Sequence, residues 1–261
     1  MSFAALIAGA DWDGECLSLS VPETWHQGRT AYGGFSTAVA LQAACRIGGE
    51  GLPPLRSAVV SFIGPVYGAV QSRARVLRRG KNAIWIAAEV LRDGEPVMTA
   101  TFVFMGPVVS TLHLNQCPPP ADLVPLDEAG AITLNPHSPQ FMRNHFDLRH
   151  ALPRGGAPRP EVRRWVRLSE RDGLDPMTEI VLLADALPPG VLPLMTAATP
   201  VSSMTWQANL LTPQPATRDG WYLLQSAGDY AENGCSSQIM RIWNADGAPV
   251  MSGMQSVAVF G

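Results

Sequence analysis

Asp185 is the residue in this sequence with the clearest capacity for acid–base chemistry. It lies in the run LLADAL, where Leu183, Ala184 and Leu187 are apolar neighbours and no polar face of a helix accounts for a carboxylate. Apolar surroundings raise the pKa of a carboxyl group, which suits a general base that removes a proton from water. The other interpretation is a helix edge at which this carboxylate simply reaches solvent.

Two further side chains are suited to positioning a water molecule. Gln255 shares a predicted strand face with Val257, and an amide on an inward face needs hydrogen-bond partners. Such an amide donates to one oxygen and accepts from another, so it can hold a water against Asp185; in the other register it is a solvated residue. Thr199 can present a hydroxyl to the same water, or it is only the extended residue that Pro200 favours.

Gly33 and Gly34 open a predicted helix. Free backbone N–H groups and the positive end of the helix dipole at this point can hold negative charge that develops on a carbonyl oxygen. The alternative is that the glycines only permit a tight turn or close packing. His26 lies seven residues before Gly33 and is the best-placed histidine for acid–base chemistry; the alternative is a loop histidine with a satisfied hydrogen bond.

Other kinds of site are not indicated. The sequence has no GxSxG elbow, no cysteine in a Cys–His context, no metal-ligand spacing and no nucleotide-binding glycine loop, so we expect neither a metal nor a cofactor. Two groups of arginines are suited to phosphate binding or to solvated strand edges. They are Arg73, Arg75, Arg78 and Arg79, and Arg163, Arg164 and Arg167.

The elements that position these residues are read from the apolar pattern. Residues 34–45 (GFSTAVALQAAC) carry no charged side chain, and a helix that is apolar or small all round must be enclosed. The segments that follow are rich in Val, Ile, Phe and Thr and are bounded by Gly, Pro and Asp, which predicts a meander of antiparallel strands around the helix. These segments are 55–64, 69–80, 83–94 and 96–106.

The same order of elements repeats in the second half. After a strand at 161–170, Asp175 and Pro176 form an N-cap followed by a first-turn proline, and the helix is predicted to run to Pro188. The final strands are predicted at 200–211, 220–232, 236–247 and 249–261. Both halves close on a shared DG, a shared PVM and an aromatic followed by Gly, so one supersecondary unit is repeated.

These patterns predict an α+β protein of two tandem units, each with a long helix wrapped by a curved antiparallel sheet. The N-terminal unit spans residues 1–107 and the C-terminal unit spans 161–261. Between them, 108–160 is rich in proline, which favours extended or irregular chain, and is predicted as a linker.

This arrangement resembles the acyl-CoA thioesterase II family, whose fold is a double hotdog. Residues 25–41 (WHQGRTAYGGFSTAVAL), 56–66 and 68–104 are similar to the first unit of that family. In the second unit the family has an Asp on the helix, a Thr shortly before a Ser-Met pair, and a Gln on the last strand. By that pattern the matching residues here are Asp185, Thr199 and Gln255, although Thr205 separates Ser203-Met204 from the aromatic Trp206.

The resemblance implies an acyl-CoA thioesterase with a role in fatty acid metabolism. Water activated by Asp185 and positioned by Thr199 and Gln255 would hydrolyse the thioester, with the N–H groups of Gly33 and Gly34 on the carbonyl oxygen. Coenzyme A is then part of the substrate and no separate cofactor is expected. Two alternatives stay open: a hotdog enoyl-CoA hydratase or dehydratase, in which His26 or another histidine faces Asp185, and a non-catalytic acyl-CoA-binding protein.

The composition and charge indicate which partners and which cellular location to expect. The 261 residues are 46% hydrophobic and 16% charged, and the net charge of -3 excludes a polycationic face for nucleic acid. No segment approaches the roughly 20 apolar residues of a spanning helix, and residues 3–10 lack the basic flank of a signal peptide, so we expect a cytoplasmic protein. Because fused units leave sheet edges and helices free to pair, we also expect a homo-oligomer, a dimer or higher.

Overall fold

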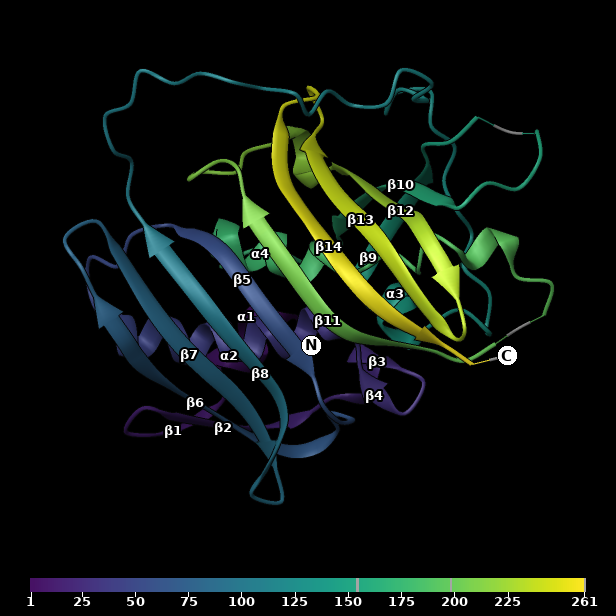
Figure 1. Cartoon of the computed structure of the whole chain (residues 1–261). Helices are drawn as coiled ribbons and strands as arrows, with labels where there is room; N and C mark the ends of the chain where they lie inside the picture. Colours follow the sequence, from purple (N-terminus) through teal and green to yellow (C-terminus); the bar gives the residue numbers. More distant parts are fainter. Residues whose placement is uncertain (154, 198, 261) are drawn as a thin grey trace.

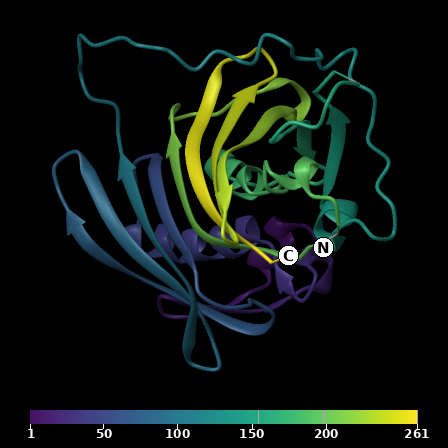
Figure 2. The same ribbon diagram turned by 45° about the vertical axis from the view of Figure 1, so that its right-hand side comes forward.

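A computed structural model describes residues 1–153, 155–197 and 199–260. In these residues a single 12-stranded sheet curls around two helices, α2 and α4, which contact each other on its inner side (Figures 1 and 2). The strand order is β1-β2-β6-β7-β8-β5-β11-β14-β13-β12-β10-β9, and the neighbouring strands pair antiparallel. This is the predicted double hotdog.

The first unit places a long helix before four strands, as the apolar pattern predicts, but only the last three form the predicted meander, because the first strand pairs with the fourth and not with the second. Its elements are α1 (Phe3–Ala8), β1 (Asp11–Asp13), β2 (Cys16–Val21), the 3-10 turn η1 (Glu23–Trp25), β3 (His26–Gln27), β4 (Thr30–Ala31), α2 (Gly33–Gly48), β5 (Leu55–Phe62), β6 (Gly68–Arg79), β7 (Ala83–Arg92) and β8 (Glu95–Met105). β3 and β4 form a separate small hairpin beside the start of α2.

The second unit repeats this order with a shorter helix. Its elements are β10 (Glu161–Leu168), α4 (Pro176–Ala184), η2 (Leu192–Leu194), β11 (Val201–Leu210), η3 (Arg218–Gly220), β12 (Tyr222–Glu232), β13 (Cys235–Asn244) and β14 (Pro249–Val259). Reading outward from the β5–β11 junction, β5-β8-β7-β6-β2 corresponds to β11-β14-β13-β12-β10. The sequence repeat is therefore a repeat of strand connectivity.

The end of α4 differs from the prediction, and the difference shapes the site. The helix was predicted to run to Pro188, but it ends at Ala184, and Asp185 is its C-cap with φ -107 and ψ 19. A proline ring clashes with the carbonyl group four residues before it, and for Pro188 that residue is Ala184. Asp185 thus lies just beyond the last helical turn.

A β-bulge explains why Trp206 stands one residue later than in the family pattern. The register of β11 against β14 shifts between Ser203 and Thr205, so Met204 is the extra residue. Met204 is exposed, whereas Trp206 is buried and lies directly opposite Gln255. The bulge therefore returns the strand to the alternation that points both side chains inward.

The range predicted as a linker contains regular structure. It includes α3 (Gln140–His145) and β9 (Phe146–His150), and β9 extends the sheet by pairing with β10. α3 packs on the first unit, where Phe141 stacks on Tyr32 at 4.1 Å between ring centroids and His145 stacks on Trp25 at 3.6 Å. The other described residues of 108–160 cross the end of the sheet as irregular chain (Figure 2).

Candidate active site

Asp185 lies where the end of α4 meets the start of α2. Its carboxylate accepts hydrogen bonds from the backbone N–H groups of Gly33 and Gly34, and its Oδ1 atom accepts one from Gln255 Nε2 at 2.7 Å. Only 9% of the Asp185 residue is exposed. The second unit therefore supplies a buried carboxylate that caps the helix of the first unit.

The two glycines are required by the closeness of this contact. A Cβ atom on Gly33 would overlap Asp185 Oδ2 and lie 2.7 Å from Phe62 Cζ, and one on Gly34 would lie 2.9 Å from the backbone oxygen of Leu182. The Tyr32 hydroxyl also donates to this Leu182 oxygen, at 2.9 Å, and ties the last turn of α4 to the start of α2. Any side chain at Gly33 or Gly34 would push the two helices apart.

Gln255 is itself held by a second buried glutamine. Gln238, which lies opposite it on β13, donates from Nε2 to Gln255 Oε1 at 2.7 Å. The Oε1 atom of Gln238 in turn accepts the backbone N–H of Gly190 at 2.8 Å. A chain of three hydrogen bonds thus runs from a loop after α4, through two strands, to the carboxylate.

Burial raises the pKa of Asp185 to about 6, against the hydrogen bonds from Gln255, Gly34 and Gly33, which lower it. Burial and the nearby Asp185 charge raise the pKa of Tyr32 well above its usual value, so this hydroxyl stays protonated. At neutral pH the carboxylate is ionised with a pKa close enough to pH 7 to make it an effective proton acceptor.

A cavity of about 400 Å³ opens onto this carboxylate, and both units line it. The first unit contributes polar and aromatic side chains, and the second contributes the carboxylate, the amide and two serines. The lining includes Arg29, Thr30, Ser36 and Phe62 from the first unit and Asp185, Ser202, Ser203 and Gln255 from the second. A substrate in this cavity would reach a base, an amide and hydroxyl groups together.

Four of the five predicted site residues come together here: Asp185, Gln255, Gly33 and Gly34. The N–H groups of the glycines, however, donate to Asp185. To hold the substrate carbonyl oxygen as predicted, these N–H groups would have to donate to Asp185 and to that oxygen together. Thr199 is not brought in: its hydroxyl donates to the backbone oxygen of Ala197 at 3.3 Å, and the described lining of the cavity does not include it.

The histidines lie elsewhere. Among the described residues that line the cavity there is no histidine, and His26, on the small β3–β4 hairpin, has its Nε2 atom buried and without a described hydrogen-bond partner. Burial lowers the pKa of His26. A hydratase or dehydratase would need a histidine opposite Asp185. The described residues of the cavity do not form that arrangement.

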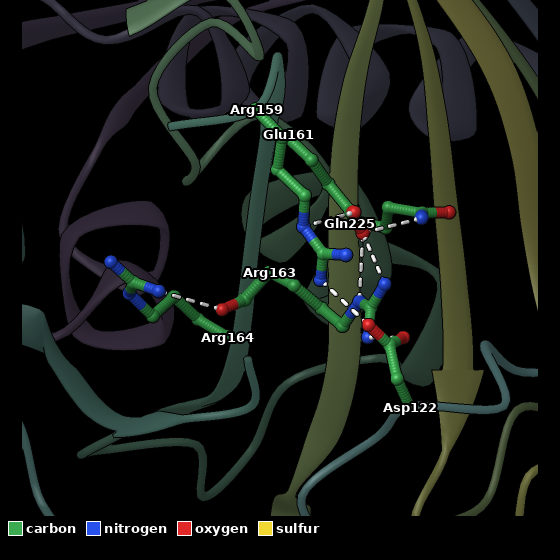
Figure 3. Close-up of polar contacts among 6 residues, drawn as sticks. All are labelled: Asp122, Arg159, Glu161, Arg163, Arg164 and Gln225. Atoms are coloured by element: carbon green, nitrogen blue, oxygen red, sulfur yellow. Dashed lines mark hydrogen bonds and ion pairs between the residues drawn. The ribbon is translucent and has the colours of Figure 1, made fainter. Parts of the chain in front are cut away.

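Most of the arginines suited to phosphate binding are engaged in structural contacts. Figure 3 shows the buried Arg163 between Asp122 and Glu161, with Nη1 at 2.8 Å from Asp122 Oδ1. Hydrogen bonds from Arg163 and Arg159 lower the pKa of Asp122 to about 2. Arg73 pairs with Glu89 on the outside of the first sheet. The cationic side chain in the described lining of the cavity is instead Arg29.

Three residues of the site were missed by sequence reasoning. Gln238 alternates with Ser236 and Met240 on the inner face of its strand, so a polar side chain at an inward position was the available signal. Tyr32 and Arg29 carry no such signal, because their roles depend on the contact between α2 and α4. Within the described residues, no group of three or more His, Cys, Asp and Glu side chains is arranged to hold a metal ion.

Comparison with models of protein families identifies the chain. Residues 21–105 match the acyl-CoA thioesterase N-terminal domain, and residues 115–259 match the acyl-CoA thioesterase C-terminal domain. The chain belongs to the acyl-CoA thioesterase family. The C-terminal match begins inside the range predicted as a linker and includes α3 and β9, which contact the first unit and β10 respectively. A search of curated protein sequences gives no match.

Solved structures share the fold over the whole length of this acyl-CoA thioesterase family member. A conserved protein of unknown function with a hot dog fold from Alicyclobacillus acidocaldarius is 22% identical, with a TM-score of 0.86 over 100% of this chain and 99% of that one. A TesB protein of Mycobacterium avium subspecies paratuberculosis is 16% identical, with a TM-score of 0.77 over 99% and 98%. The acyl-CoA thioesterase II TesB2 of Mycobacterium marinum is 17% identical, with a TM-score of 0.68 over 99% and 98%. No helix among the described residues is long and apolar enough to cross a membrane.

Proposed function

We propose that this protein hydrolyses acyl-CoA thioesters with Asp185 as the general base. The observation that carries the proposal is the buried Asp185 carboxylate, held by Gln255 and by the start of α2, on the wall of a cavity shared by both units. A desolvated carboxylate with a pKa of about 6 matches the requirement for proton removal from water at neutral pH.

The reaction follows from this placement. Asp185 takes a proton from a water molecule as the water oxygen attacks the thioester carbonyl carbon. The tetrahedral intermediate then expels the coenzyme A sulfur, which leaves as a thiolate or takes the proton back from Asp185. The products are a carboxylic acid and free coenzyme A thiol. The Gln255 amide holds the ionised Asp185 in place and lines the same cavity.

Thr199 keeps its proposed role only if its segment moves, since its hydroxyl is turned to Ala197. Ser203 lies on β11 in the lining of the cavity and is the hydroxyl residue better placed to contact a bound water or substrate. Arg29 is the cation available to the phosphates of coenzyme A at this cavity.

Release of free thiol from acyl-CoAs of short to long chain tests the proposal. The wild type is compared with Asp185→Asn and with Asp229→Asn, a matched change at an exposed carboxylate of the second unit, and thermal melts confirm that all three fold. We expect Asp185→Asn to lose about 10² to 10⁴ in rate and Asp229→Asn to match the wild type. A folded wild type that releases no thiol at any chain length would leave acyl-CoA binding without catalysis as the better interpretation.

A further inference from the structure

Gln238 is a fully buried glutamine that does not belong to the described lining of the cavity, yet it is hydrogen-bonded to a residue that does. Its position on β13 faces Gln255 on one side and Gly228 of β12 on the other. The Gln238 amide also reaches the backbone of Gly190, whose N–H donates to Gln238 Oε1 at 2.8 Å. Gln238 therefore joins the loop after α4 to the amide that holds Asp185.

The direction of this chain is set at its far end. A backbone N–H can only donate, so the N–H of Gly190 requires the carbonyl oxygen of Gln238, and not its NH2 group, to face it. The NH2 group of Gln238 must then face Gln255, whose carbonyl oxygen accepts the hydrogen bond. That leaves the NH2 group of Gln255 directed at Asp185 Oδ1.

The anchor at Gly190 is rigid. A Cβ atom at Gly190 would overlap the Gly228 backbone nitrogen and lie 2.9 Å from the Ser226 oxygen, so the loop is packed directly on β12. Gly228 in turn donates its N–H to the Pro160 oxygen at 2.8 Å. A shift of the loop would disturb its packing on β12, and this packing supports the orientation that the Gly190 N–H imposes on Gln238.

We propose that Gln238 is a positioning residue: together with the Gly190 N–H, it fixes the Gln255 amide so that its NH2 group, and not its carbonyl oxygen, faces Asp185. The inference rests on the proposed function, in which Asp185 is the general base. Without Gln238, the Gln255 amide is free to turn by half a rotation and present its oxygen to the carboxylate. Two acceptors at hydrogen-bond distance repel, which disfavours the ionised form of Asp185.

Loss of Gln238 therefore raises the pKa of Asp185, which the hydrogen bond from Gln255 lowers in the wild type. The other ionisable groups in the described lining of the cavity are Arg29 and Tyr32, and neither takes part in the chain of amides. Glu179, earlier on α4, pairs with Arg171. The hydrogen-bond partners of Asp185, which are Gly33 and Gly34 of α2 and Gln255 of β14, do not titrate, and neither do Phe62 of β5 and Ser203 of β11 in the lining of the same cavity.

The pH profile of kcat/KM for thiol release from an acyl-CoA separates positioning from space-filling. Gln238→Met keeps the shape but cannot hydrogen-bond, and we expect its acid limb to move up by about half to one pH unit, the size of one lost hydrogen bond. Its rate relative to the wild type should recover as the pH rises. Gln225→Met on β12 removes a glutamine bond to Glu161 in the same sheet, and its rate ratio should not change with pH.

Gln238→Glu keeps an acceptor for the Gly190 N–H and serves as the second variant if Gln238→Met does not fold. The neutral acid donates to Gln255 as the amide does, whereas the carboxylate cannot donate. Where Gln238→Glu is ionised, Gln255 loses the same donor as in Gln238→Met, so the acid limb of its profile should also lie at higher pH than that of the wild type. An active wild type with Gln238 variants whose profiles have the wild-type shape would overturn the inference and leave the proposed function standing.

A second readout does not depend on activity. Each of the wild type and Gln238→Met is compared with its Asp185→Asn counterpart, and the difference in Tm is followed with pH, which reports the protonation of Asp185 in each background. A midpoint that moves to higher pH in Gln238→Met supports the inference even if no thioester is hydrolysed. An unchanged midpoint overturns it. In a Gln255→Met background, Gln238→Met should cause no further shift, because Gln238 acts only through Gln255.

Discussion

The two helices of this protein begin differently, although they occupy matching places in the two units. α4 starts with Asp175, whose side chain accepts the N–H groups of Met177 and Thr178 at 2.9 and 3.1 Å, and with Pro176, which has no N–H. α2 has Tyr32 at its N-cap and no side-chain cap of its own. Its free N–H groups are filled by Asp185 from the other unit.

The partner positions differ in the same way. Gln42 and Asp185 each lie nine residues after the start of their helix, and each reaches the first turn of the other helix. Gln42 donates only to the Thr178 hydroxyl, at 3.1 Å. A helix that is capped by its own side chain has no free donors for a carboxylate from its neighbour, so only one of the two junctions becomes a candidate active site.

The strands behind each helix sharpen the contrast. Phe102 and Gln255 each lie four residues after the shared PVM, and their partners on the adjacent strand are Ile86 and Gln238. All four residues are buried. The first unit therefore has apolar side chains at the two strand positions where the second unit has amides. A carboxylate in place of Gln42 would find no amide donor on these strands.

Exchanging the helix residues is the strongest test of this comparison. Asp185→Asn should lose about 10² to 10⁴ in rate, and adding Gln42→Asp to it should restore nothing, because Asp175 already occupies the N–H groups of α4. Thiol release by the single and double variants measures this. Recovery of activity in the double variant would show that the two junctions are interchangeable.

Gly33→Ala should have the next largest effect. The new Cβ overlaps the Asp185 carboxylate and displaces it, and a displacement of about 1 Å is enough to cost on the order of 10²-fold in rate. Pro176→Ala, the matching first position of α4, should leave the rate unchanged. Steady-state kinetics on both variants, with melts to confirm folding, checks the pair; equal losses at the two positions would contradict the assignment.

Rate and stability should respond to pH in opposite directions. With a pKa of about 6, Asp185 is ionised in about a tenth of the molecules one pH unit lower, so the rate should fall about tenfold there. The folded-state pKa lies above the usual value of 3.8, so the stability from this group is complete below pH 3.8 and is lost as pH rises through 6. Relative to Asp185→Asn, the wild type should lose up to about 3 kcal/mol across that window in urea titrations.

The smallest expected effect is at the self-capped helix. Asp175→Ala removes the acceptor for two N–H groups of α4 and should lower the free energy of unfolding by about 1 kcal/mol. The rate of thiol release should stay at the wild-type level, since Asp175 is not part of the described lining of the cavity. Chemical denaturation and kinetics on one preparation test both statements. A large loss of activity without unfolding would show that the start of α4 contributes to the reaction.

The fold was largely predictable because its signals are local. Apolar alternation marks the strands, the absence of charge over 34–45 marks an enclosed helix, and Asp175 with Pro176 marks the start of α4. The one error in helix length arose because Pro188 acts on a residue four positions before it. Regular structure within 108–160 was missed because proline dominates that range, while α3 and β9 are short.

Site residues could be predicted from the sequence only where a polar side chain stands at a position that its helix or strand would normally fill with an apolar one. Asp185 in an apolar helix and Gln255 on an inward strand face stand out in the sequence, and both are found together. The part played by Gly33 depends on which unit supplies the carboxylate, and that contact joins residues about 150 positions apart. Thr199 rested on spacing alone, and spacing does not fix the path of an irregular segment.

Covalent fusion of the two units allows each half to specialise. In a symmetric homodimer of single units, a substitution appears in both copies, so a carboxylate gained by one helix is gained by the other as well. In one chain, Gln42 and Asp185 are separate positions that can differ. In the same way, α2 can lack a side-chain N-cap while α4 has one in Asp175. Among the described residues, the result is one junction with the features of the candidate site, assembled from both halves, where symmetry would produce two.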